Sequence, residues 1–283
     1  MGEVVVSKAG LIVTHRMTRP GRAVGLAAGI AIALTVAAPR PATAQSDWGF
    51  SFDLYGWLPF IEGDVIVAGQ TVGVDLNTVD VLQDADDVAG AIFRIEGTNG
   101  SWGVWTDLVY LDLTFDTVTA IGPADIFPVA IETGFSQLIW ETAGFYRIVD
   151  DAAGGPGGAP LSVDLYGGVR YVDFETDITS TTPLAVRQVS SSTDWVDPLF
   201  GARLSMGEPQ GLNAVLLADI GGFGVGSEFA WQAAAYLGYG FDLGDGIDLN
   251  LYLGYRALGF DYDDERTIDV TFHGPVFGAS FSF

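Results

Sequence analysis

The stretches Phe229-Ala-Trp-Gln-Ala-Ala-Ala-Tyr-Leu-Gly-Tyr-Gly-Phe241 and Ile247-Asp-Leu-Asn-Leu-Tyr-Leu-Gly-Tyr-Arg-Ala257 flank a turn at residues 243–246. In both stretches the odd positions are mostly large and apolar, while the even positions between them are small or polar. This period of two is typical of a strand with one apolar face. Each arm also reaches the roughly 9–11 residues that a transmembrane strand needs. The hairpin therefore predicts two strands of a membrane-spanning β-barrel.

Composition agrees with a barrel and limits the partners. Mean hydropathy is positive, at +0.33, although no apolar run beyond the N-terminus approaches a spanning helix. Residues 1–44 contain five of the 12 basic groups and one of the 36 acidic groups. Seven basic and 35 acidic groups remain in residues 45–283, a net charge of −28. Such a chain repels nucleic acid, so we expect no nucleic-acid partner, whereas a small polar or cationic solute is compatible with it.

The N-terminus has the features of a secretory signal peptide. A basic start at residues 17–22 precedes an apolar, Ala-rich core at residues 23–38, and Ala42-Thr-Ala44 is a small-x-small cleavage site. We expect residues 1–44 to be removed and residues 45–283 to form one barrel domain in a Gram-negative outer membrane. Either Met1 or Met17 can be the start, and a single anchoring helix is the competing interpretation.

Further along the chain, alternation predicts an all-β, closed, antiparallel, up-and-down transmembrane barrel of about ten strands, with eight or 12 as alternatives. Residues 60–87 are expected outside the membrane, with a short hairpin and one helical turn, or as two additional short strands. Residues 116–130, 175–194 and 259–266 are expected as long loops at the same end. The last strand changes its apolar parity, so we expect a β-bulge at Gly274-Pro275.

Charged residues of both signs recur on the non-apolar faces of the expected strands. In hydrocarbon each charge would cost up to about 2–4 kcal/mol, so we expect them to face the lumen. The predicted lumen-lining residues are Asp53, Arg94, Glu96, Glu141, Arg147, Asp164, Arg170, Asp197, Arg203, Asp219, Glu228 and Arg256. They form either a salt-bridged filling or a narrow polar pore, because a barrel of this size is only slightly wider than one filled by its side chains.

Other motifs carry weaker signals. The glycines of Asp219-Ile-Gly-Gly-Phe-Gly-Val-Gly-Ser227 precede a strand rather than a helix, so a tight turn is favoured over a phosphate-binding loop. His273 is the sole histidine after residue 44, and it is expected to be a hydrogen-bonded lumen or rim residue. Asp261, Asp263, Asp264 and Glu265 form an acidic loop without EF-hand spacing. We expect no cofactor, no metal site and no catalytic residues.

Several segments together resemble a known family. They are Trp102-Gly-Val-Trp-Thr-Asp-Leu-Val-Tyr110, Trp195-Val-Asp-Pro-Leu-Phe-Gly-Ala-Arg203, Asp219–Ser227, Gly254-Tyr-Arg256 and His273-Gly-Pro275. The chain resembles small, porin-like outer-membrane β-barrel proteins of proteobacteria. That resemblance implies the barrel fold, the outer-membrane location and contact with outer-membrane lipid and lipopolysaccharide. Terminal Phe283 likewise resembles the signal by which the barrel-assembly machinery inserts such proteins.

Three functions remain open from the sequence. The first is a narrow porin-like channel or a structural membrane protein with a charged lumen, without catalysis. The second is a surface binding or adhesion barrel that acts through its extracellular loops. The third, less favoured, is a lipid hydrolase that uses His273 in a site assembled across strands.

Overall fold

The computed structural model describes residues 48–67, 70–121, 127–263 and 267–283; the expected signal peptide lies outside them. Among the described residues, no helix is both long and apolar enough to cross a membrane. The elements are β1 (Gly49–Trp57), β2 (Phe60–Val67), β3 (Gln70–Asn77), α1 (Thr78–Asp84), β4 (Asp87–Thr98), β5 (Trp102–Ile121), β6 (Phe127–Asp151), β7 (Leu161–Thr181), β8 (Val186–Gly207), β9 (Leu212–Gly222), β10 (Phe229–Gly244), β11 (Ile247–Asp263) and β12 (Thr267–Ser282).

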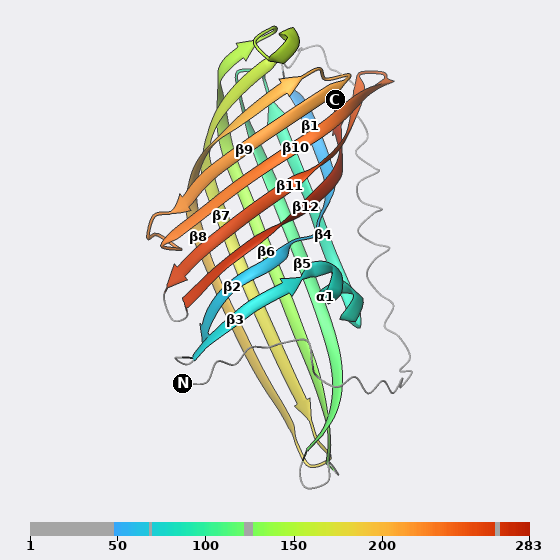
Figure 1. Ribbon diagram of the computed structural model, residues 1–283, viewed down its shortest axis with the longest axis vertical. Coiled ribbons are helices and arrows are strands. Elements are labelled where there is room, and N and C mark those ends of the chain that lie inside the picture. Colours follow the sequence, from blue (N-terminus) through green and yellow to red (C-terminus); the bar gives the residue numbers. More distant parts are fainter. Residues whose placement is uncertain (1–47, 68–69, 122–126, 264–266) are drawn as a thin grey trace.

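The fold is a closed antiparallel barrel of ten strands, with β2 and β3 as two additional strands (Figure 1). Neighbours pair in the order β1, β4, β5 and onward to β12, and β1 closes the ring by pairing with β12 from Ser51↔Ser282 to Trp57↔Val276. Closure gives backbone donors and acceptors partners along the wall, which a sheet in hydrocarbon requires. The predicted barrel and its strand number are confirmed.

The additional strands arise because β12 is longer than β1. Its C-terminal half pairs with β1, and its N-terminal half, Thr267–His273, pairs with β2. Pro59 separates β1 from β2, and its carbonyl accepts a hydrogen bond from the backbone amide of Thr78. Asn77 caps α1 by accepting from the amide of Val79 at 3.0 Å. The predicted hairpin and helical turn in residues 60–87 are confirmed, and β2 adds them to the wall.

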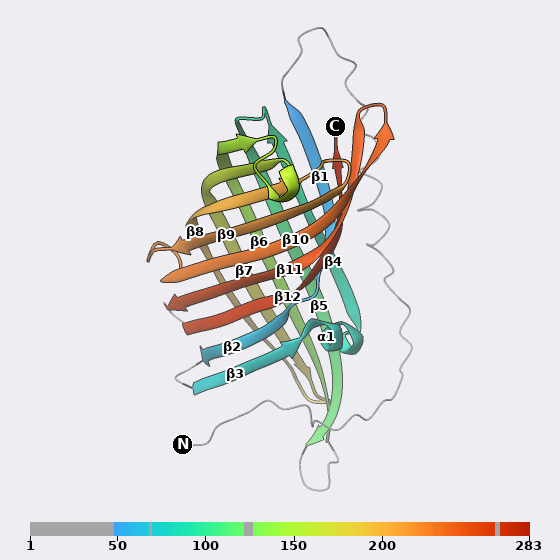
Figure 2. The ribbon, with the colours of Figure 1, turned by 45° about the horizontal axis from the view of Figure 1, so that its top comes forward.

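The two ends of the barrel differ in length. We call the end with Gly49 and Phe283 the terminal end and the opposite end the extended end. At the extended end β5, β6, β7 and β8 run far beyond their neighbours as a four-stranded sheet, which we call the extension (Figure 2). The loops expected at residues 116–130 and 175–194 are therefore largely strand, and those predictions were wrong. The expected loop at residues 259–266 is also strand as far as Asp263, and its remainder lies outside the described residues. Their Thr, Val and Ile residues pair across strands, as in Thr117↔Ile131 and Ile178↔Val189.

The inner face of the barrel changes character along its length. On β12 the side chains of Ile268, Val270 and Phe272 are buried inside, as is Val276 beyond them. The pairing of β11 with β12 runs without a register shift, so the bulge expected at Gly274-Pro275 is wrong. Phe277 and Phe281 face outward at the parity of His273. In the N-terminal half of β12 the inward positions are therefore apolar, while the outward positions Thr267, Asp269 and Thr271 are polar. The alternation is inverted there relative to the C-terminal half, which is the reason that parity alone misled.

Candidate functional site

The inside of the barrel concentrates the charged residues. Six arginines lie in the described residues, and five of them are on the inner face, while Arg187 is exposed on the extension. Among the predicted lumen residues, 11 lie on the inner face: Asp53, Arg94, Glu96, Glu141, Arg147, Asp164, Arg170, Asp197, Arg203, Asp219 and Arg256. Glu228 shares the inward parity of Ala230 but is exposed at the rim.

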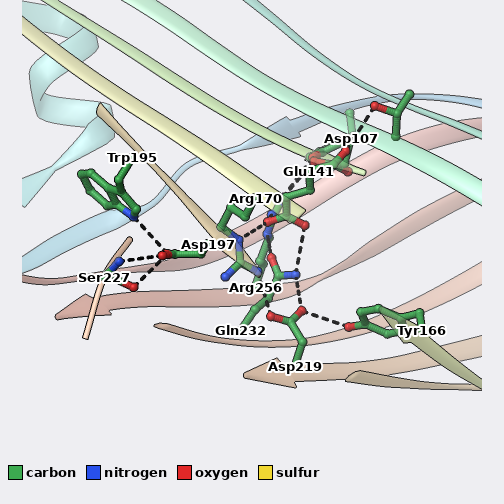
Figure 3. A network of polar contacts seen from close by, with 12 residues as sticks. Asp107, Glu141, Tyr166, Arg170, Trp195, Asp197, Asp219, Ser227, Gln232 and Arg256 are labelled. Carbon is green, nitrogen blue, oxygen red and sulfur yellow. Dashed lines mark hydrogen bonds and ion pairs between the residues drawn. The ribbon is translucent and has the colours of Figure 1, made fainter. Parts of the chain in front are cut away.

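A belt of paired charges crosses the middle of the barrel. Arg170 on β7 is fully buried, and its guanidinium donates to Glu141 Oε1 on β6 and to Asp219 Oδ1 on β9, each at 2.8 Å. Tyr166 donates to Asp219 Oδ2 at 2.9 Å. Charge-assisted hydrogen bonds of this kind are the strong ones, and they compensate a charge removed from water. Figure 3 shows these side chains converging from separate strands.

Arg256 on β11 joins the belt from the opposite wall. Its guanidinium donates to Glu141 Oε1 at 3.1 Å and to Asp107 Oδ1 at 3.4 Å. Its Nε donates to Gln232 Oε1 at 2.6 Å, and the Gln232 amide donates to Asp219 Oδ2 at 2.9 Å. We call Asp107, Glu141, Arg170, Asp219, Gln232 and Arg256 the ionic belt. It ties β5, β6, β7, β9, β10 and β11 together across the lumen.

A second ionic cluster lies between the belt and the terminal end. Arg203 on β8 forms a bidentate ion pair with Glu96 on β4, and its Nη2 also donates to Asp164 at 2.8 Å. Arg147 donates to the other oxygen of Asp164, also at 2.8 Å. Arg94 lies 3.4 Å from Glu96 and 4.1 Å above the ring of Trp105. This cluster connects β4 with β7 and β8 across the lumen.

Asp197 holds the β9–β10 turn. The backbone amide of Ser227 donates to Asp197 Oδ1 at 2.7 Å, and the Ser227 hydroxyl donates to Oδ2 at 2.8 Å. The indole of Trp195 donates to Oδ2 at 2.9 Å, and all three residues are buried (Figure 3). Two of the sequence segments that carry the resemblance, Trp195–Arg203 and Asp219–Ser227, therefore contact each other. The glycine-rich segment is a turn, as predicted.

Beyond the belt, toward the extended end, the lumen is filled by apolar side chains. We call Trp57, Trp195, Phe260, Tyr262 and Phe272 the aromatic plug. Trp195 stacks on Tyr262 with ring centroids 4.5 Å apart and meets Phe260 edge-on at 5.5 Å. Leu258, Ile139 and Val172 pack into the same cluster with 1% exposure or less. The belt and the plug together occupy the middle of the lumen.

His273 lies on the outer face of the barrel, not in the lumen or at a rim. Its Nδ1 is 2.7 Å from the hydroxyl of Tyr255, and its Nε2 is 3.6 Å from the exposed carboxylate of Glu62. This group contains no serine nucleophile. Among the described residues no three His, Cys, Asp or Glu side chains are placed to hold a metal ion.

Sequence reasoning missed several members of these networks. Gln232 is a lone amide at an inward position of the alternating hairpin, and Asp107 has the inward parity of β5, so parity could have found both. Ser227 and Tyr55 could not be found in this way, because their roles depend on contacts with Asp197 and Asp107 that bridge 30 and 52 residues.

No protein-family model and no curated protein sequence matches this chain. The solved structures to which its shape is similar include the following three. The first is Ail of Yersinia pestis, in complex with a heparin analogue (13% identity, 84% of this chain, 100% of that chain, TM-score 0.33). The others are the translocator domain of autotransporter NalP from Neisseria meningitidis (12%, 83% and 88%, 0.32) and the toluene transporter TodX of P. putida (7%, 84% and 90%, 0.22). These are outer-membrane β-barrels of Gram-negative bacteria, and at such similarity they carry no argument about function.

Proposed function

We propose that this chain is an integral outer-membrane barrel that is closed to solutes and binds partners through its extension. The outer face supports the membrane location. Leu253 is 66% exposed, Leu237 50% and Leu251 48%, and the same pattern recurs around the wall. A water-soluble protein rarely exposes so large a continuous apolar surface. Hydrocarbon and lipopolysaccharide acyl chains would cover it. Phe283, 61% exposed, is the residue that we propose the assembly machinery reads.

The closed interior favours the structural alternative over the porin-like one. A solute that crossed the barrel would have to displace Arg170 from Glu141 and Asp219. Leaving such charges buried and unpaired is strongly unfavourable. The solute would then have to displace the tightly packed side chains of the aromatic plug. The single observation that carries this conclusion is the full burial of Arg170 between two carboxylates at the centre of the lumen.

We expect the wild-type protein to leave a planar lipid bilayer sealed. Purified, folded protein is inserted into the bilayer in concentrated KCl, and the current is recorded across a range of voltages. No stepwise conductance is expected, whereas a general porin treated in the same way serves as the positive control. Reproducible steps that grow with salt concentration would overturn the closed-lumen proposal.

The extension has the features of a binding surface. It projects from the end opposite the termini, which we place outside the cell because both termini of an even-stranded barrel lie in the periplasm. Within the described residues, its first edge, Phe115–Ile121 of β5, has no strand beside it on the β4 side. Its other edge, Val186–Asp194 of β8, has none on the β9 side. Exposed edges of this length pair readily with an extended segment of another chain.

The outward face of the extension is strongly acidic. Its outward positions carry Asp112, Asp116, Glu132, Asp173, Glu175, Asp177 and Asp194. Two acidic pairs face each other directly across strands, Asp116↔Glu132 and Asp173↔Asp194, an arrangement that destabilises a sheet. Partial burial and the neighbouring Asp194 carboxylate raise the pKa of Asp173. A face that retains such repulsion resists lying on a lipid surface, so the edges stay accessible to partners.

Shortening the extension should abolish binding and leave the barrel folded. Residues 115–133 and 175–192 are each replaced by Asn-Gly, which joins the opposed pairs Thr114↔Gly134 and Phe174↔Thr193 through a two-residue turn. A displayed library of random nonapeptides is selected on the full protein in nanodiscs, with the shortened variant as counter-selection. We expect the selected peptides to slow hydrogen exchange of the amides in Val186–Asp194. Equal binding to the shortened variant, or protection elsewhere, would contradict the proposal.

A further inference from the structure

On the terminal side of the ionic belt, the lumen contains a cavity of about 220 Å³. Its walls include Asp53, Tyr55, Glu96, Tyr236 and Tyr252. A second hollow of about 390 Å³ lies at the terminal end, and the two share Ser51 and Glu96 in their walls. The inner cavity, which we call the chamber, is therefore a dead-end space that adjoins the terminal mouth and ends at the belt. Its volume accommodates one small solute, because a single water occupies about 30 Å³.

Asp53 differs from the other acids inside the barrel. Glu96, Asp107, Glu141, Asp164 and Asp219 each pair with at least one arginine. Asp197 lacks an arginine but accepts three hydrogen bonds. Asp53 forms no ion pair with a described residue, its Oδ1 is buried without a hydrogen-bond partner, and the neutral side chain of Ser280 is the donor beside it.

The arginine opposite Asp53 is engaged elsewhere. Arg94 is its cross-strand partner in the backbone register, yet the Arg94 guanidinium lies against Glu96 and over Trp105. The chamber wall also includes Arg94 and Arg203, but both arginines pair with other acids, so Asp53 is left as a carboxylate without an ion pair. A buried, unbalanced carboxylate is costly, and a cation that enters the chamber would relieve that cost.

The rings beside Asp53 define the chemistry of that cation. Tyr252 lies across Gly278, where an added Cβ would be 2.6 Å from the ring and 2.7 Å from the Tyr55 Cβ. Tyr236 lies across Gly254 in the same way and meets Tyr252 edge-on at 5.6 Å. The two glycines thus let tyrosine rings from β10 and β11 reach over the sheet toward β1. Aromatic faces beside a carboxylate suit an organic ammonium group, whereas Ca²⁺ takes six to eight oxygen ligands.

We propose that the chamber binds a small organic monocation of the ammonium class, with Asp53 as its counter-charge and Tyr252 and Tyr236 as its aromatic walls. The site is reached from the terminal end and does not depend on the extension. No covalent step is involved. The cation binds and leaves on the same side of the belt.

Choline and its uncharged isostere 3,3-dimethylbutan-1-ol provide the test. Each is titrated calorimetrically into the full protein in nanodiscs, beside empty nanodiscs. We expect choline to bind saturably and the uncharged isostere to bind at least about tenfold more weakly, a difference of about 1.4 kcal/mol. D53N should weaken choline binding by about tenfold or more, while D261N, which removes an exposed acid at the extended end, should leave it unchanged.

Two further results complete the test. Folding of each variant is checked by its heat-dependent mobility on a denaturing gel, and Tyr252→Leu replaces D53N as the decisive variant if D53N does not fold. Loss of choline binding in either variant, with D261N intact, supports the chamber site. Equal affinity for choline and its isostere, no saturable binding, or choline binding unchanged by D53N and Tyr252→Leu would overturn it.

Discussion

Replacing Arg170 by methionine is expected to lower the free energy of unfolding by about 3–5 kcal/mol. Methionine fills most of the arginine volume, so the loss reflects charge rather than a large cavity. Glu141 loses one of its two arginine partners, and Asp219 loses its only one, at a position with no access to water. Unfolding in urea, followed by tryptophan fluorescence in lipid vesicles, measures the change.

Two variants show whether the loss comes from uncompensated charge. Arg187→Met removes the exposed arginine of the extension, and it should change stability by no more than about 0.5 kcal/mol. Adding Glu141→Gln to Arg170→Met removes one stranded carboxylate, so the double variant should be more stable than the sum of the single changes predicts. A loss below about 1 kcal/mol for Arg170→Met, or strict additivity, would mean that the belt contributes little to holding the barrel closed.

Much of the fold could be predicted because the strands of a barrel wall alternate between outward apolar residues and inward small or polar residues. Alternation in residues 229–257 indicated two strands and their faces, and the same period identified the inward arginines. Each of Arg94, Arg170 and Arg256 stands at the polar parity of an otherwise apolar strand. Parity shows which face a charge occupies. Parity does not show which acidic residue on another strand forms an ion pair with that charge.

The apolar half of the lumen could not be predicted from the same pattern. In β12 at Val270 and Phe272 the inward positions are apolar and their outward neighbours Asp269 and Thr271 are polar, so the alternation is inverted. The sequence predicted a bulge because such an inversion is indistinguishable, along the chain, from a shift of register. Aromatic residues at inward positions belong to a filled interior, and only the cross-barrel contacts of Trp195 distinguish that filling from a register shift.

The extension was missed for a related reason. Residues 175–194 are rich in Ser, Thr and acids, a composition that favours loops when read along the chain. Apart from the turn at residues 182–185, these residues nevertheless face partners across the β7–β8 hairpin, as Glu175 faces Ser192. Hairpin growth beyond the barrel continues a sheet that is already nucleated, so weak local propensity suffices.

Trp195→Ala should be the most disruptive single change in the aromatic plug. Trp195 is 5% exposed and packs against Phe174, Phe260 and Tyr262. Its indole N–H also donates to Asp197, which holds the β9–β10 turn through Ser227. Truncating a buried tryptophan costs about 3–5 kcal/mol through lost burial and the cavity that remains. The same urea titration in vesicles measures the loss.

Trp195→Phe separates packing from hydrogen bonding at this position. Phenylalanine keeps an aromatic ring against Tyr262 but cannot donate to Asp197, which retains both bonds from Ser227. We therefore expect a loss of about 1–3 kcal/mol, smaller than that of the alanine variant. If the two variants lost equal stability, the indole hydrogen bond would dominate and the plug would contribute little packing energy. If neither lost more than about 1 kcal/mol, the lumen at Trp195 would be loosely filled, and the barrel would have to be regarded as a potential pore.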